Sequence, residues 1–123
     1  MFWIQPNYSM RKDDLIRLHH MLDAANEALA FAEDNTRIDL DSNRMLTLSL
    51  VKCIEIIGEA AVNISKDSRE ALPQIPWSNI VGMRNRLIHA YFSINLDIIW
   101  KTVQENLPDL VQELEKIVDD AES

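Results

Sequence analysis

Apolar residues recur at spacings of three and four along most of this 123-residue chain, which is the period of an α-helix. Only 2 Gly and 4 Pro interrupt it, so long helices are favoured over a loop-rich or hairpin-rich fold. We find no convincing alternation of apolar and polar residues that would indicate a strand. The clearest stripe comprises Leu15, Leu18, Leu22, Ala25, Leu29 and Ala32.

The pattern predicts helices over about residues 10–34, 43–66 and 76–90, a fourth that follows Asn95, and a fifth near Pro108. Pro108 either begins this fifth helix or kinks the fourth. The helix over 43–66 is apolar on several faces, which is typical of a helix at the centre of a bundle or against a second subunit. We therefore predict a single all-α domain over residues 1–123, an up-and-down bundle of four to five helices.

Polar residues and prolines indicate where these helices begin. Ser9 is a candidate N-cap for the first helix, Asp41 or Ser42 for the second, and Asn95 for the fourth. Pro76 suits the first position of the third helix. We expect residues 34–43 to form a loop, and 66–75 a broken segment with one short helical turn near Arg69.

Composition narrows the function. Hydrophobic residues make up 47% of the chain, which is typical of a globular protein. The net charge of -8 argues against a general nucleic-acid binder but leaves room for a local basic site. The single cysteine, Cys53, lies in an apolar run and is expected to be a buried thiol. No signal peptide or membrane-spanning stretch is apparent, so we expect a cytoplasmic protein.

One short segment concentrates groups that can act on RNA. Residues 84–91 hold Arg84, Asn85, Arg86, His89 and Tyr91 in an acidic chain. Arginine can hold a phosphate, and histidine can take a proton from a 2'-hydroxyl or give one to the leaving oxygen. This mechanism needs no metal and no cofactor. On an ideal helix His89 neighbours Asn85 and Arg86, whereas it lies about 140° from Arg84.

The same residues also admit ordinary structural roles. Arg84 and Arg86 could be solvated or ion-paired, and His89 could cap the C-terminus of a helix. Tyr91 could cover the core with its hydroxyl in water. The residue types alone do not decide between these roles and catalysis.

Glu55 and Glu59 lie four residues apart on the second predicted helix, in otherwise apolar surroundings. We expect Glu59 to orient Arg84 or Arg86, although a solvated pair of carboxylates is an alternative. Gly58 and its small neighbours would let another backbone come close at the same point. His19 and His20 are adjacent and point to different helix faces, so we expect no metal site.

The spacing Arg84, four residues, His89, Ala90, Tyr91 resembles the Arg-x4-His-x-Tyr motif of the HepT-like toxins in the HEPN superfamily. The resemblance covers nearly the whole chain from about Ser9. It also rests on segments whose order and spacing follow that family, namely 56–61, 73–77, 82–92, 97–100 and 107–108.

The resemblance implies a HEPN-like fold and an RNA-cleaving toxin of a two-gene toxin–antitoxin system. Arg84 and His89 would be catalytic, with Asn85 and Arg86 positioning the phosphate. The implied partner is a minimal nucleotidyltransferase, MntA-like, that can add AMP to Tyr91. Two other functions stay open: a HEPN-type module that binds RNA or nucleotide without cutting, and a helical adaptor that docks a nucleotidyltransferase.

One motif supplies one histidine, whereas acid–base cleavage is better served by two proton-transfer groups. A two-fold dimer with the third helices face to face would supply the second. It would also explain the apolar faces of the second helix. We therefore expect a homodimer.

Overall fold

The computed structural model describes residues 9–89 and 95–122, and every regular element in these ranges is helical. The side chain of His89 and the whole of Tyr91 lie outside the described part of the chain. The elements are α1 (Lys12–Ala32), α2 (Asp39–Ser42), α3 (Arg44–Asn63), α4 (Lys66–Ala71), α5 (Trp77–His89), α6 (Leu96–Lys101), a π-helical turn η1 (Thr102–Asn106) and α7 (Leu107–Glu122).

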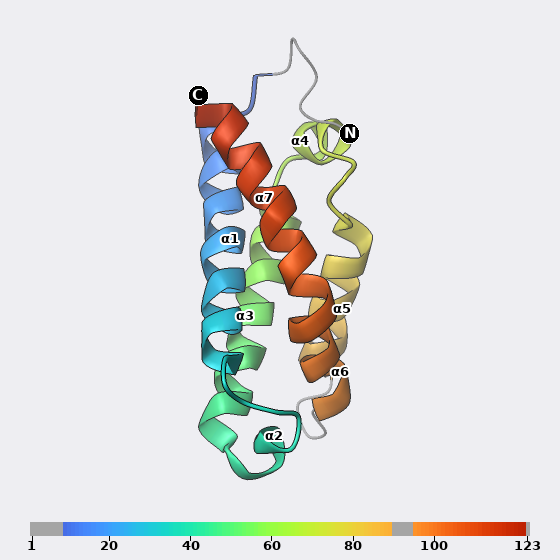
Figure 1. The fold of residues 1–123 in the computed structure, drawn as a ribbon. Coiled ribbons are helices and arrows are strands. Elements are labelled where there is room, and N and C mark those ends of the chain that lie inside the picture. Colours follow the sequence, from blue (N-terminus) through green and yellow to red (C-terminus); the bar gives the residue numbers. More distant parts are fainter. Residues whose placement is uncertain (1–8, 90–94, 123) are drawn as a thin grey trace.

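The long helices alternate in direction. The chain runs down α1, up α3, down α5 and up through α6, η1 and α7 (Figure 1). Helix α1 packs against both α3 and α7, whereas α5 packs mainly against α3. The predicted all-α, up-and-down architecture is confirmed. No helix in the described ranges is long and apolar enough to cross a membrane.

The core lies between α1, α3 and the C-terminal helices. Leu18, Met21, Leu50, Ile99 and Leu114 are among its fully buried side chains. The predicted stripe on α1 omitted Met21, Ala24 and Ala28, which are also buried, because α1 packs against α3 on one side and α7 on the other. Cys53 is buried as predicted, and burial together with the charge of Glu27 raises the pKa of its thiol.

A buried carboxylate joins the start of α1 to the start of α4. Asp14 accepts hydrogen bonds from the backbone N–H of Ser65 at 3.0 Å and from the hydroxyls of Ser65 at 2.5 Å and Ser68 at 2.7 Å. Burial alone would raise the pKa of Asp14. The hydrogen bonds from Ser65 and Ser68, together with the charge of Arg11, outweigh it and hold the pKa below its ordinary value.

The helix starts lie within one or two residues of the predicted ones, but two of the predicted N-caps are wrong. Helix α1 follows Arg11, which makes no side-chain cap, so Ser9 does not cap it. Helix α3 is capped by Asn43, whose side chain accepts the N–H of Leu46 at 3.0 Å, and not by Asp41 or Ser42. The Asn95 cap is confirmed by its hydrogen bond from the N–H of Ile98 at 3.1 Å.

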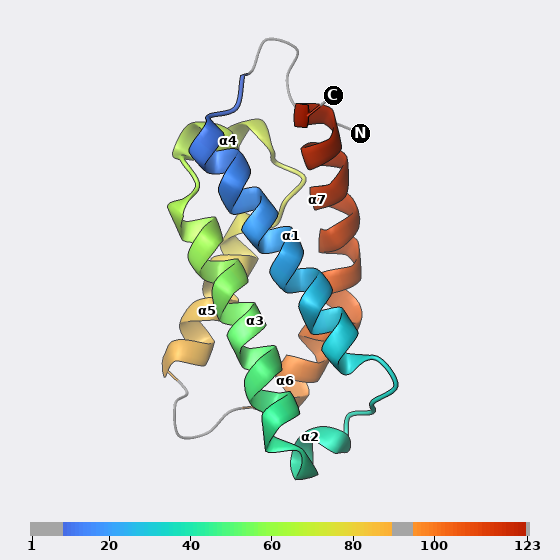
Figure 2. The same ribbon diagram turned by 90° about the vertical axis from the view of Figure 1, so that its left-hand side faces the viewer.

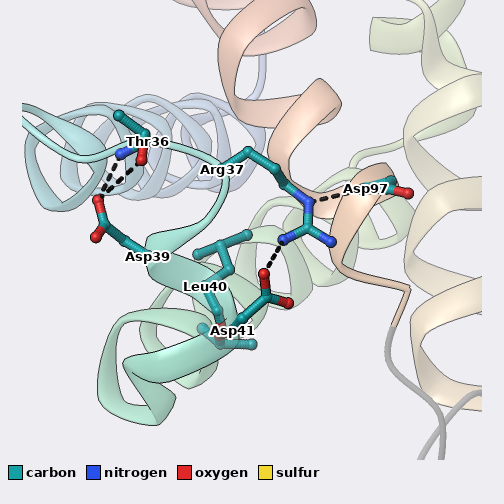
Figure 3. Close-up of polar contacts among 7 residues, drawn as sticks. Thr36, Arg37, Asp39, Leu40, Asp41 and Asp97 are labelled. Atoms are coloured by element: carbon teal, nitrogen blue, oxygen red, sulfur yellow. Dashed lines mark hydrogen bonds and ion pairs between the residues drawn. The ribbon is translucent and has the colours of Figure 1, made fainter.

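The predicted loop over 34–43 contains the short helix α2, which local polar contacts stabilise (Figure 3). The carboxylate of Asp39 accepts the backbone N–H of Thr36 at 2.7 Å. Arg37 donates to Asp41 at 3.3 Å and to Asp97 at 2.6 Å, and so ties this connection to the start of α6.

Pro108 lies at the start of a helix, as one of the two predicted alternatives has it, although that helix is not separate from the one before it. It is the second residue of α7, which continues directly from α6 through η1. In this wider turn the N–H of Leu107 bonds to the carbonyl of Thr102, five residues earlier. Proline has no N–H for the carbonyl four residues before it, so a local π turn accommodates it without ending the helix.

Candidate functional site

Helix α5 carries the residues that the sequence marks for chemistry, and its start is fixed by two contacts. The carbonyl of Pro76 accepts the N–H of Ile80 at 3.0 Å, so Pro76 immediately precedes the helix. The indole of Trp77 donates to the carbonyl of Leu72 at 3.0 Å. Half-buried Met83 and Leu87 then turn the inner face of α5 toward the core.

The two helices α3 and α5 are in close contact at Gly58. A Cβ placed on Gly58 would lie 2.3 Å from the Cβ of Arg84 and 2.6 Å from its Cγ, closer than nonbonded carbon atoms can approach. The side chain of Arg84 therefore lies directly over the glycine. The close approach predicted from Gly58 and its small neighbours is confirmed.

Arg84 is paired with Glu59, the next residue on α3. Its Nη2 donates to Oε2 of Glu59 at 3.2 Å, and Nη1 lies 3.5 Å from Oδ1 of Asn85. The Arg84 side chain is 25% exposed and Glu59 is 65% exposed, so the carboxylate lies at the surface and not in the apolar surroundings that the sequence indicated. The Nε of Arg84 is buried and has no partner among the described residues.

The ion pair is one of the roles that the sequence left open for Arg84, and it is compatible with catalysis. A guanidinium that already donates to one carboxylate is oriented, and its remaining N–H groups can still donate to a phosphate. The structure thus brings Arg84, Asn85 and Glu59 together.

Arg86 faces another side of α5. It is exposed and lines a cavity of about 920 Å³ that α5 shares with α3, η1 and α7. Residues two positions apart on a helix point in directions about 200° apart, which explains why Arg84 and Arg86 diverge. The α7 side of this cavity carries Glu105, Asp109 and Glu113.

His89 is the last residue of α5, and Arg84 lies five residues earlier in the same continuous helix. The predicted offset of about 140° between these positions therefore holds for the backbone. The placement of the His89 imidazole and of Tyr91 lies outside the described part of the chain, so their roles stay predictions.

A second, smaller groove of about 260 Å³ lies between α1 and α3, and it was not predicted. Arg17 and His20 line it from α1, and Lys52 and Glu59 line it from α3. These residues are far apart in the sequence. The sequence did contain a sign of this groove, because Arg17 and His20 are three residues apart and share a helix face off the apolar stripe.

Among the side chains that the structure describes, which exclude that of His89, no group of three or more His, Cys, Asp or Glu could hold a metal ion. The adjacent histidines do diverge. His19 contacts Glu122 at 3.0 Å, whereas His20 faces the groove on α3.

Comparison with known proteins identifies the family. Residues 21–117 match the sequence family described as ribonuclease HepT-like, so the chain belongs to this family of the HEPN superfamily. It is 37% identical over 105 residues to a Methanocaldococcus jannaschii protein provisionally named RNase MJ1380, covering 85% of this chain and 96% of the relative.

Two further relatives come from other organisms. A Thermococcus cleftensis protein provisionally named ribonuclease HepT is 38% identical over 95 residues, covering 74% of this chain and 86% of the relative. A Caldanaerobacter subterraneus protein provisionally named RNase TTE0752 is 36% identical over 101 residues, covering 82% of this chain and 90% of the relative. No solved structure matches the chain significantly.

Proposed function

We propose that this HepT-like ribonuclease is the toxin of a two-gene toxin–antitoxin system and cuts RNA internally without a metal ion. The observation that carries the proposal is the oriented guanidinium of Arg84, which is paired with Glu59 of α3. Arg84 lies on α5, which also holds His89 at the family's spacing. We place this activity in the cytoplasm, where RNA substrates are present.

In the proposed reaction, the 2'-oxygen of a ribose attacks the adjacent phosphorus and the bond to the 5'-oxygen breaks. His89 transfers a proton, either from the 2'-hydroxyl or to the leaving 5'-oxygen. Arg84 stabilises the charge that develops on the phosphate, and Asn85 and Arg86 help to position it. Glu59 acts through Arg84 and does not touch the substrate.

A homodimer would complete this site. Each chain supplies one motif histidine, and a two-fold axis beside α5 would bring a second His89 to the same cleft. Two features support this arrangement. The side chains of α5 at 77–87 all keep some exposure, and the large cavity beside the helix includes apolar residues such as Ile80 and Met83.

Silencing would come from a nucleotidyltransferase antitoxin, MntA-like, that adds AMP to Tyr91. Tyr91 follows His89 by two residues. An adenylyl group there would bring bulk and negative charge to the phosphate site, and so would exclude RNA by occupancy and by repulsion.

The nuclease is tested with purified protein and RNA in EDTA. We expect cleavage by the wild type, and loss of cleavage in both His89→Ala and Arg84→Ala. Arg44→Ala is the matched control, because Arg44 is exposed at the start of α3. RNA binding without products would instead support a non-catalytic HEPN module. Absence of binding, combined with a stable nucleotidyltransferase complex, would support a helical adaptor.

The modification is tested separately by intact mass after co-expression with the cognate nucleotidyltransferase. We expect the mass of one AMP on the wild type and none on Tyr91→Phe. Addition of AMP to the phenylalanine variant would reject Tyr91 as the site.

A further inference from the structure

The groove of about 260 Å³ between α1 and α3 adjoins the motif helix through one shared residue. Glu59 lines this groove and also bonds Arg84 on α5. In Figure 2, α3 lies between α5 and α1, so the three helices form one continuous side of the molecule. We call this groove, with Arg17, His20, Lys52, Glu55 and Glu59 on its walls, the α1–α3 groove.

The cations of the α1–α3 groove are available to a ligand. Neither Arg17 nor Lys52 forms an ion pair with another described residue, although Arg17 is half-buried and Lys52 is exposed. Of the two carboxylates on its walls, Glu59 is already engaged by Arg84. The groove lining therefore balances Arg17 and Lys52 against Glu55 and Glu59, and Arg84, which lies outside the lining, offsets the charge of Glu59, in a chain whose net charge is -8.

The described lining of the cavity on the other side of α5 is more negative. There Arg86 alone faces Glu105, Asp109 and Glu113. A polyanion that reaches the motif is repelled by that wall and attracted toward the α1–α3 groove. The charges therefore favour an RNA strand that runs from the motif across α3 toward α1, and disfavour one that runs toward α7.

We propose that the α1–α3 groove binds a backbone phosphate of the RNA strand next to the cleaved bond, through Arg17, Lys52 and the imidazole of His20. The proposal rests on the ribonuclease function above and adds a second contact point for its substrate. No Phe, Tyr or Trp is among the described side chains that line the groove, so bases do not stack there. The contact is to the backbone and carries no sequence preference.

The test measures RNA affinity against salt concentration for Arg17→Gln and Lys52→Gln, singly and together. Glutamine keeps most of the aliphatic stem and removes the charge. A His89→Ala background prevents cleavage during the titration. Loss of the contact to this one phosphate should make the slope of log affinity against log salt shallower by about 0.7 for a single strand, and the double variant should show the full change. Arg44→Gln, outside the groove, should leave the slope unchanged.

A second readout separates this contact from catalysis. In the active protein, Arg17→Gln/Lys52→Gln should raise KM for an oligonucleotide of several residues and leave kcat and the cleavage of a dinucleotide unchanged. Thermal unfolding of each variant confirms that the fold is retained. Glu105→Gln, which removes one negative charge from the cavity on the other side of α5, should not weaken RNA binding.

The outcomes are distinct. A slope and KM equal to those of Arg44→Gln would overturn the groove contact while the nuclease stands. A wild type that binds but does not cut would overturn the nuclease, and the salt slope would still decide the groove. A wild type that does not bind RNA at all would overturn both.

Discussion

The two sides of α3 are packed very differently. Toward α1, the interface is closed by side chains with no exposure, including Leu18, Met21 and Leu50. Toward α5, each described side chain of the partner helix keeps some exposure, and the close crossing depends on Gly58. Stability therefore resides mainly between α1, α3 and α7, and the groups proposed for chemistry lie on the more lightly packed helix.

This difference in packing predicts which substitutions should change stability and which should change activity. Contacts on the α1 side are expected to change unfolding free energy, because they involve groups removed from water. Contacts on the α5 side are expected to change activity more than stability. The elements that bind ligands are generally drawn from the less stable parts of a fold.

The largest effect is expected at Asp14, which fixes α1 to the start of α4. Asp14→Ala leaves the N–H of Ser65 without the partner it has in the folded protein and removes two hydroxyl contacts to a charged group. Hydrogen bonds to charged groups contribute about 1.5–3 kcal/mol each, so we expect a loss of about 3 kcal/mol or more by urea unfolding at pH 7. The exposed neighbour Asp13→Ala is the control, and an equal loss there would contradict the prediction.

The pH dependence follows from the same contacts. The pKa of Asp14 is lowered in the folded state, so the stability it contributes is present above the unfolded pKa of about 3.9. That stability is lost as the pH falls through the folded-state pKa. The difference in unfolding free energy between wild type and Asp14→Asn should be constant above about pH 5 and shrink below about pH 4. A difference that stays constant down to pH 2 would show that Asp14 is not titrating as described.

Gly58 and Gly82 offer a matched pair on the α5 side. Alanine normally stabilises a helix interior by about 0.5–1 kcal/mol relative to glycine. At Gly82 no described atom outside its chain neighbours and its own helix backbone lies within 4 Å of the added Cβ, so Gly82→Ala should gain that amount. At Gly58 the Cβ would meet Arg84 at 2.3 Å, and the forced shift should cost about 1–3 kcal/mol and outweigh the gain.

The same pair reports on activity. Gly58→Ala displaces Arg84 and should reduce RNA cleavage, whereas Gly82→Ala should leave it unchanged. Thermal unfolding and cleavage rates measured on both variants check the two expectations together. Equal stability and equal activity in the two variants would show that α5 adjusts to the added methyl group at no cost.

Sequence periodicity was sufficient for the architecture, because apolar spacing determines which face of each helix is buried. It was less informative at helix ends. Asn43 caps α3 although two candidates stood just before it, since a cap depends on local backbone geometry. The continuous path through Pro108 also needed the structure, because a π turn has no clear sequence signal.

Part of the candidate site was also predictable from the sequence, and part of it needed the structure. A pairing of Glu59 with Arg84 or Arg86 was predicted from a carboxylate in apolar surroundings; the partner is Arg84, and the carboxylate proved to be exposed. The offset of about 140° between Arg84 and His89 was predicted from helix geometry, and it holds for the backbone because α5 is continuous. The α1–α3 groove was missed because Arg17 and Lys52 meet only through the packing of α1 on α3.

The smallest effect is expected outside both interfaces, at Arg37. Its Nε donates to Asp97 at 2.6 Å and its Nη1 to Asp41 at 3.3 Å (Figure 3). The hydrogen bond to Asp97 raises the pKa of Arg37, so the arginine stays charged at any pH where the protein is folded. Asp97 is 82% exposed, and water and salt screen an ion pair of this kind.

Arg37→Gln should therefore lower the midpoint of thermal unfolding by less than Gly58→Ala does. The shift should disappear in 1 M salt, where the screening length falls to about 3 Å. Asp97→Asn should give a smaller shift, because it removes one of the two contacts of Arg37, and the double variant should lose no more than Arg37→Gln alone, because that substitution already removes both. A shift that persists in 1 M salt would show that the contact acts through packing of the Arg37 stem, and stability would then depend on this connection as well as on the α1 side of α3.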